Sequence, residues 1–152
     1  MFTVPVGCMN VVTLTSRPTS NTVTSGSVTN PANCYDGSPS TYAEMNGAAG
    51  FYVANIAGGV ISSPITISVT VYNNIASGGP GSGTSTAVIS VDGGGTFPYS
   101  LWSISGVTDA SATYSVTLPS LTNLSSIWVK FATSTSGGWT VITDIYDVKA
   151  TY

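Results

Sequence analysis

The fold of this chain is decided by the stretch Ile65-Thr66-Ile67-Ser68-Val69-Thr70-Val71-Tyr72, in which apolar and polar residues alternate. Successive side chains of a β-strand point to opposite faces, so a period of two predicts a strand with one buried face. The residues expected to face the core are Ile65, Ile67, Val69 and Val71. The opposite face of this strand would then carry mainly hydroxyl groups.

The same alternation continues along the chain at Ala87, Ile89 and Val91, and Asp92-Gly93-Gly94-Gly95 follows directly. Glycine accepts positive φ angles, so this run predicts a hairpin turn into a strand over residues 97–104. Further strands are predicted over residues 11–15, 22–28, 51–56, 114–118, 127–131 and 140–152. The Ser/Gly-rich segment 76–85 has few apolar side chains to pack and is predicted to form a long exposed loop.

Eight or nine short strands separated by turn signals such as Asn30-Pro31, Asn46-Gly47 and Gly137-Gly138 are typical of two packed sheets. A chain of 152 residues is large enough for one core. We therefore expect a single all-β domain over residues 1–152, an antiparallel two-sheet sandwich of the jelly-roll type.

Charged residues are scarce, at 6% of the chain against about 25% in an average soluble domain. The three basic residues, Arg17, Lys130 and Lys149, are far apart in the sequence, and the net charge is −3. Nucleic acids and anionic membrane surfaces require a concentrated basic patch, so neither is an expected partner. Weak self-repulsion favours packing against copies of the chain or a larger partner, so a homo-oligomer is expected.

The residue inventory argues against an enzyme. The chain has no histidine, which removes the common triads, Cys-His pairs and histidine-ligated zinc. No motif indicates the carboxylate pair of a glycosidase. Asp92 and Asp109 lie in turn-like sequence, where aspartate commonly bonds its own backbone. Asp144 and Asp147 are expected on opposite faces of one strand.

One segment resembles a known family. Residues 34–43, Cys-Tyr-Asp-Gly-Ser-Pro-Ser-Thr-Tyr-Ala, resemble the Asp-Gly-x-x-x-Thr-aromatic loop of discoidin-like, galactose-binding-like jelly rolls. Residues 141–148 are similar to the closing strand of that family, in which an acidic residue sits among aliphatic ones. The resemblance implies an eight-stranded jelly roll with the Asp36 loop packed beside the last strand.

The resemblance also implies a calcium site, with Asp36, Thr41 and Asp144 as ligands and Ser38 where the family often has an acidic or amide residue. Calcium takes six to eight oxygen ligands of these kinds. The departures are Asp144 in place of the usual glutamate, Ser38 in place of an acidic or amide residue, and cysteines at positions 8 and 34, whereas cysteines of the family tend to join the two termini. The alternative is a turn without metal, in which Asp36 and Ser38 accept backbone N–H bonds.

Two tryptophans are candidates for contact with a partner or for stacking on a sugar ring. Trp128 alternates with Ile127, Val129 and Phe131 and is expected on the exposed face of its strand. Trp139 follows Gly137-Gly138 in a turn. A protein contact is favoured over a sugar contact for both.

Composition and resemblance lead to two hypotheses. The first is a bacteriophage virion structural protein, such as a capsid decoration protein, head fibre or tail component, with other virion subunits as partners. The second is a carbohydrate-binding module or adhesin-type domain that binds surface glycans. Residues 1–15 lack the basic start of a secretory signal, so assembly into a virion in the host cytoplasm is expected. Cys8 and Cys34 are expected to be small buried thiols, with a bridge between them as the alternative.

Overall fold

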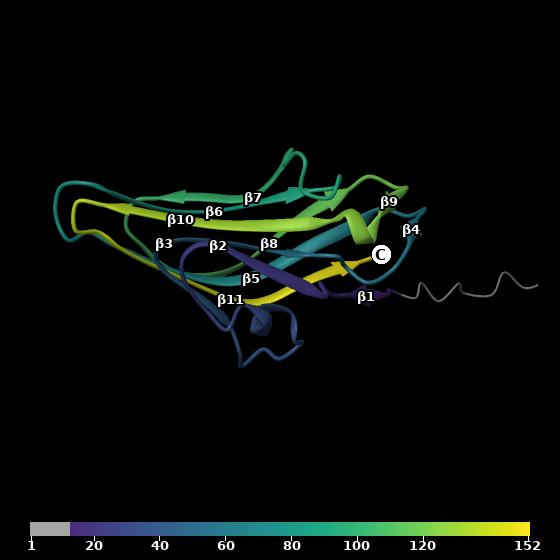
Figure 1. Ribbon diagram of the computed structural model, residues 1–152, viewed down its shortest axis with the longest axis horizontal. Coiled ribbons are helices and arrows are strands. Elements are labelled where there is room, and N and C mark those ends of the chain that lie inside the picture. Colours follow the sequence, from purple (N-terminus) through teal and green to yellow (C-terminus); the bar gives the residue numbers. More distant parts are fainter. Residues whose placement is uncertain (1–12) are drawn as a thin grey trace, which may run out of the picture.

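The computed structural model describes residues 13–152 of the chain, and strands dominate them (Figure 1). The strands and the two short 3-10 helices, in chain order, are β1 (Thr15–Ser16), β2 (Ser20–Thr29), η1 (Pro31–Tyr35), β3 (Ala43–Ala54), β4 (Val60–Ile61), β5 (Ile65–Ala76), β6 (Ser82–Ser90), β7 (Tyr99–Ser105), β8 (Thr108–Leu118), β9 (Thr122–Asn123), η2 (Leu124–Ser126), β10 (Trp128–Ser136) and β11 (Thr140–Thr151).

The long strands form one antiparallel path in the order β7-β6-β10-β3-β11-β5-β8, with β1 paired to β11 and β2 paired to β3. This path folds over so that β7, β6 and β10 lie in one layer and β11, β5 and β8 lie in the other (Figure 1). The end strands β7 and β8 contact each other and nearly close the structure. The expected all-β antiparallel jelly-roll sandwich is confirmed.

The bent hairpin of β2 and β3 joins the two layers. Residues 43–46 of β3 pair with β11, and residues 49–53 of the same strand pair with β10. Gly26 lies at the bend with φ +66°, and a Cβ atom there would lie 2.0 Å from the Ala48 carbonyl oxygen. Since no other residue fits so close to a backbone, this corner depends on glycine.

The core between the layers contains a chain of aromatic rings. Phe131 lies 5.1 Å from Phe51 and 5.8 Å from Trp102, and Trp102 lies 5.1 Å from Tyr114, measured between ring centroids. Phe51 and Phe131 are fully buried and Trp102 nearly so. Because Tyr114 is on β8 and Trp102 on β7, these rings also fill the side on which the two end strands meet.

A buried polar cluster crosses between the layers inside this core. The Trp102 indole N–H donates to Ser85 Oγ over 3.0 Å. The Thr143 hydroxyl lies 2.9 Å from Asn73 Oδ1 and 3.2 Å from Ser85 Oγ. Ser85 is on β6 and Thr143 is on β11, so the cluster connects the two layers with hydrogen bonds as well as with apolar contact.

The alternation at residues 65–72 is confirmed, and in the structure it extends through Ile75. The hairpin at Asp92 is also confirmed, because β6 and β7 pair across it. The Asp92 carboxylate accepts bonds from the Ser90 hydroxyl and from the Thr96 backbone N–H, as expected for a turn aspartate.

The expected long loop over residues 76–85 is wrong. Strand β5 continues to Ala76 and β6 begins at Ser82, so residues 77–81 alone connect them. The connection is held by the neighbouring β10–β11 turn: Gly78 lies so close to the Gly138 carbonyl that a Cβ would be 2.1 Å from its oxygen. Of the strand expected over residues 11–15, positions 11 and 12 lie outside the described residues, and β1 begins at Thr15.

Candidate functional site

A β-bulge in the last strand decides where its acidic residues lie. Ile145 pairs with Val71 of β5, but Asp147 pairs with Thr70, so Tyr146 is an extra residue on β11. Beyond such a bulge the alternation of side chains shifts by one position. Asp144 and Asp147 therefore lie on the same outer face of the sheet. The expectation of opposite faces is wrong because it assumed a strand without a bulge.

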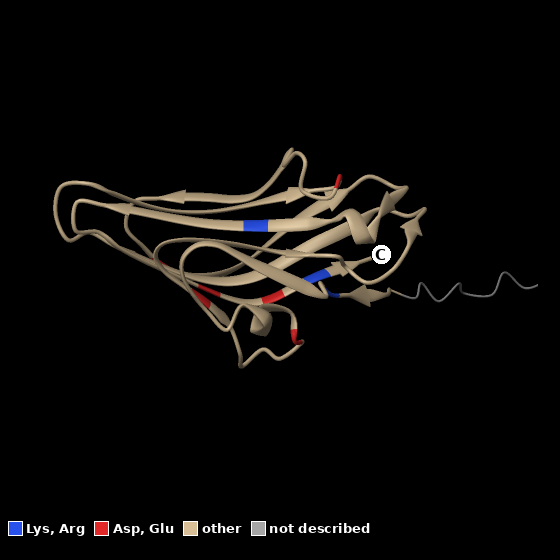
Figure 2. Ribbon diagram, in the orientation of Figure 1, with Lys and Arg blue, Asp and Glu red and all other residues tan. Residues whose placement is uncertain are grey.

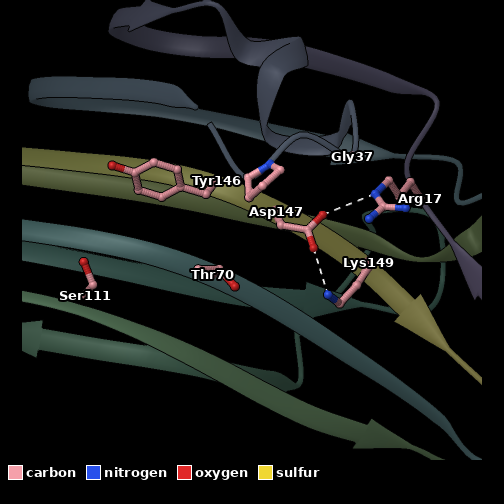
Figure 3. Close-up of a pocket in the computed structure, with 8 residues that line it drawn as sticks. Arg17, Gly37, Thr70, Ser111, Tyr146, Asp147 and Lys149 are labelled. Carbon is pink, nitrogen blue, oxygen red and sulfur yellow. Dashed lines mark hydrogen bonds and ion pairs between the residues drawn. The ribbon is translucent and has the colours of Figure 1, made fainter. Parts of the chain in front are cut away.

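Asp147 is the centre of an ion cluster on this outer face. Arg17 Nε lies 3.2 Å from Asp147 Oδ1, and Lys149 Nζ lies 2.9 Å from Asp147 Oδ2 (Figure 3). Lys149 lies two residues beyond Asp147 on the strand, and Arg17 follows β1, which pairs with the C-terminal end of β11. Figure 2 shows two of the chain's three basic residues near that end and the third on β10.

The cluster lies in an open cavity of about 550 Å³. Strands β5, β8 and β11 and the loop after η1 all contribute to its lining, which consists of Arg17, Gly37, Pro39, Thr70, Ser111, Tyr146, Asp147 and Lys149. The loop after η1 thus lies beside the last strand, as the resemblance implied. Thr70 and Ser111 supply neutral hydroxyl groups and Tyr146 an aromatic ring, so the lining can form both polar and apolar contacts.

Much of the hydrogen-bonding capacity of the two cations remains available. The guanidinium of Arg17 bonds one protein group through Nε, and within residues 13–152 its two Nη groups have no protein partner. Asp147 is likewise the one protein partner of the Lys149 ammonium in that part of the chain. The side chains of Arg17 and Lys149 are 34% and 37% exposed, against 17% for Asp147. The cavity therefore presents N–H donors to solvent.

The residues predicted to bind calcium occupy two different surroundings. Asp36 Oδ1 accepts the Ser38 backbone N–H over 2.7 Å, and Oδ2 accepts the Thr41 hydroxyl over 2.7 Å. These two bonds hold the pKa of the Asp36 carboxyl below its ordinary value, and the bond from Thr41 has the larger effect. Ser38 Oγ in turn accepts the Ser40 backbone N–H. Asp144 lies on the sheet, paired across from Glu44. Within residues 13–152, no group of three or more aspartate, glutamate or cysteine side chains lies close enough together to hold a metal ion.

Calcium binding at this loop stays a prediction, and it has a direct test. If Asp36, Thr41 and Asp144 bind the ion, millimolar calcium raises the melting temperature of the wild-type chain and leaves that of Asp36→Asn unchanged. Differential scanning calorimetry before and after chelation measures this difference. An equal melting temperature with and without calcium would leave Asp36 as the acceptor of a turn.

The two candidate tryptophans both lie outside this cavity. The Trp128 ring stacks on Tyr52 with centroids 4.5 Å apart, and a Cβ on Gly94 would meet the same ring at 2.5 Å. Trp128 is on the outer face of β10 as expected, but these neighbours leave it half-buried. Trp139 is also half-buried, and its indole N–H donates to the Gly79 carbonyl over 2.8 Å. Their roles in binding stay predictions.

A second group of polar residues lies next to the cavity. Glu44 on β3, Asp144 on β11 and Tyr72 on β5 occupy one row across three strands. Asp144 is 9% exposed, and its Oδ1 atom has no hydrogen-bond partner. Burial, and then the neighbouring Glu44 carboxylate, raises the pKa of Asp144 to about 6. Tyr72 donates its hydroxyl proton to Asp109 Oδ1 over 2.8 Å. Asp109 was expected to bond its own backbone in a turn, but it lies on β8 and accepts this bond from the neighbouring strand β5.

Sequence reasoning did not identify Arg17, Lys149 or Tyr146 as site residues. The available signal was the spacing of Asp147 and Lys149, which places both on one strand face. No local signal connects Arg17 to them, since it lies 130 residues from Asp147.

Cys34 is buried as expected, and its pKa is raised by that burial, whereas Cys8 lies outside the described residues.

The comparisons with known proteins concern the fold. No protein-family model matches the chain, and no curated protein matches it. A solved structure of similar fold is the CBM32 of AlyQ in complex with 4,5-unsaturated mannuronic acid, with 18% identity over 91% of this chain and 98% of that chain and a TM-score of 0.43. An adhesin domain of Lys-gingipain from Porphyromonas gingivalis has 14% identity over 88% of this chain and 97% of that chain, with a TM-score of 0.49.

A third similar structure is the enzymatically active domain of bacteriophage CBA120 tailspike protein 4, with 18% identity, a TM-score of 0.48 and coverage of 91% of this chain and 19% of that chain. TmCBM61 in complex with beta-1,4-galactotriose is a further structure of similar fold, with 12% identity over 91% of this chain and 86% of that chain and a TM-score of 0.39. Within residues 13–152, no helix has the length and apolar character needed to cross a membrane.

Proposed function

We propose that this chain is a carbohydrate-binding or adhesin-type domain without catalytic activity, and that the cavity around Asp147 is its sugar site. The observation that carries the proposal is the Arg17–Asp147–Lys149 cluster, which lies partly exposed in an open cavity beside Tyr146. This proposal follows the second of the two hypotheses drawn from the sequence.

The lining suits the chemistry of a sugar. Sugar hydroxyls both donate and accept hydrogen bonds, and bonds to charged groups are stronger and shorter than bonds between neutral groups. Asp147 accepts, while Arg17 and Lys149 donate, so adjacent hydroxyls of one ring can be bound together. Tyr146 offers an apolar ring face for the C–H side of the sugar. A few placed polar groups beside an aromatic ring are typical of small-molecule sites.

The same lining does not suit hydrolysis of a glycosidic bond. Glycosidases of the common type use two carboxyl groups, one on each side of the bond. Among the residues that line the cavity, Asp147 is the one carboxylate, and both of its oxygens pair with cations. Binding without turnover is the activity that such a site supports.

The proposal is tested by measuring oligosaccharide binding of the purified chain, first on a glycan array and then by calorimetry. We expect Asp147→Asn to weaken sugar binding at least tenfold, because the change removes the negative charge and one of the two acceptor oxygens and so breaks both ion pairs. Lys130→Gln is the matched control, since Lys130 lies on β10 beside Phe97 and outside the cavity. Near-ultraviolet circular dichroism verifies that each variant is folded.

Three results would overturn the proposal. The first is that no glycan binds at all. The second is that Asp147→Asn binds as tightly as the wild type. The third is that Trp128→Ala or Trp139→Ala abolishes binding while Asp147→Asn retains it, which would move the sugar site to another surface.

The virion role, with other virion subunits as partners, stays a separate prediction, and a virion protein that displays a sugar-binding domain would satisfy both.

A further inference from the structure

We propose that the ligand of this cavity is an acidic sugar, and that its carboxylate binds Arg17 and Lys149. The inference rests on the proposed function and deepens it by naming the class of sugar. It is drawn from three features of the cavity. They are its charged groups, the N–H groups of Arg17 that bond no protein atom, and the hydrogen bonds that the nearby Asp36 carboxylate makes within its own loop.

The first feature is charge. The whole chain has a net charge of −3 and three basic residues, and two of those three line this one cavity. The lining contains two cations and one carboxylate, and the Asp36 carboxylate next to Gly37 also interacts electrostatically with Arg17. On a chain so poor in cations, a cavity that holds two of them is the place where an anionic ligand group finds charged N–H donors.

The second feature is the geometry of the arginine. Its guanidinium is a planar fork that binds a carboxylate through two parallel N–H bonds. Asp147 occupies Nε, so the edge formed by the two Nη groups is available to a second carboxylate. Gly37 lies over the guanidinium, and a Cβ at this position would be 3.5 Å from Arg17 Cζ. This is an ordinary van der Waals distance, so Gly37 borders the guanidinium without blocking it, and its φ of +84° favours glycine at this position.

The third feature is that the other carboxylate near Arg17 is already bonded. Asp36 follows η1 in the loop that contributes Gly37 and Pro39 to the lining. Both Asp36 oxygens accept bonds from its own loop, one from the Ser38 backbone and one from the Thr41 hydroxyl. Neither oxygen pairs with the guanidinium of Arg17. Within the described residues, no carboxylate of the loop therefore bonds the Nη groups of Arg17, which lines the cavity.

The test compares oligosaccharides of a uronic acid with the same oligosaccharides after their carboxyl groups are reduced to alcohols, and with sulfated forms of the reduced chains. Calorimetry is expected to show at least tenfold tighter binding of the uronic acid form than of the reduced form. Raising the salt concentration should weaken the uronic acid form more than the neutral one.

The variants separate charge from geometry. Arg17→Gln should remove most of the preference for the uronic acid form, and Arg17→Lys should restore a part of it, because lysine keeps the charge and loses the fork. Lys130→Gln should keep the full preference. Melting temperatures measured alongside establish that the Arg17 variants are folded.

The outcomes that overturn this inference differ from those that overturn the proposed function. Equal binding of the uronic acid and reduced forms, or tighter binding of the sulfated form, would overturn the carboxylate assignment and leave a sugar site in place. Binding of none of the three forms, nor of any other glycan, would overturn the proposed function itself. A preference that Arg17→Gln leaves intact would overturn the role of Arg17.

Discussion

Phe131→Ala is expected to lower the free energy of unfolding by about 4 kcal/mol, a value typical of the loss of a fully buried phenylalanine. Phe131 is completely buried and contacts both Phe51 and Trp102, so its removal leaves a cavity in the aromatic chain of the core. For a domain of this size the change corresponds to a melting temperature lower by about 10 °C.

Urea denaturation followed by tryptophan fluorescence measures this change. Lys130→Ala is the matched control, because Lys130 precedes Phe131 on β10 and its side chain points to solvent. An exposed substitution of this kind should stay within about 0.5 kcal/mol of the wild type. A loss below about 1 kcal/mol for Phe131→Ala would mean that the two layers are not packed through this ring.

Asp144→Asn is expected to stabilise the chain at pH 7.5 and to lose that effect in acid. Burial and the Glu44 carboxylate raise the pKa of Asp144 to about 6, whereas an aspartate in an unfolded chain titrates near 3.9. The folded state therefore holds this proton more tightly than the unfolded state. The stability of the wild type falls as the pH rises from about 4 to about 6, and it stays lower above that range.

The asparagine side chain does not ionise, so the variant avoids this loss. At pH 7.5 the free energy of unfolding is expected to rise by about 1–2 kcal/mol. This figure is smaller than the full pKa difference implies, because water that reaches the neighbouring Glu44 and Tyr72 side chains screens the charge of Asp144. Thermal unfolding measured from pH 3.5 to 8 gives the comparison. Asp147→Asn on the same strand is the contrasting variant: it removes two ion pairs and should lower the melting temperature at pH 7.5. A gain for Asp144→Asn that is independent of pH would contradict the argument.

The sequence by itself determined the class of fold. Alternation at residues 65–72 predicts a half-buried strand because the side-chain period of a strand is a geometric constant, and β5 has that burial pattern. The glycine run after Asp92 predicts a hairpin because glycine accepts positive φ without strain, and Gly93 and Gly94 have φ angles of 76° and 88°. Both are local properties, which the chain encodes over a few residues.

The extent of the strands was decided by tertiary structure. Segment 76–85 looked like a loop, because Ser and Gly dominate it and its apolar residues are few. In the folded chain the N-terminal part of β6 pairs with β10, where hydroxyl groups bond across the strands, as between Thr84 and Ser134 at 2.7 Å. Such pairing stabilises a strand that has weak intrinsic preference, and it requires a partner about 50 residues away.

The candidate site was decided by tertiary structure almost entirely. Arg17 and Lys149 are isolated charges in the sequence, and their separation argued against any basic site. Pairing of β1 with the end of β11 brings Arg17 beside Asp147, and the bulge at Tyr146 turns Asp147 and Lys149 together to the outer face that also carries Asp144. Strand partners and bulges depend on how the whole sheet packs, so contacts between residues 130 positions apart have no signature in local sequence.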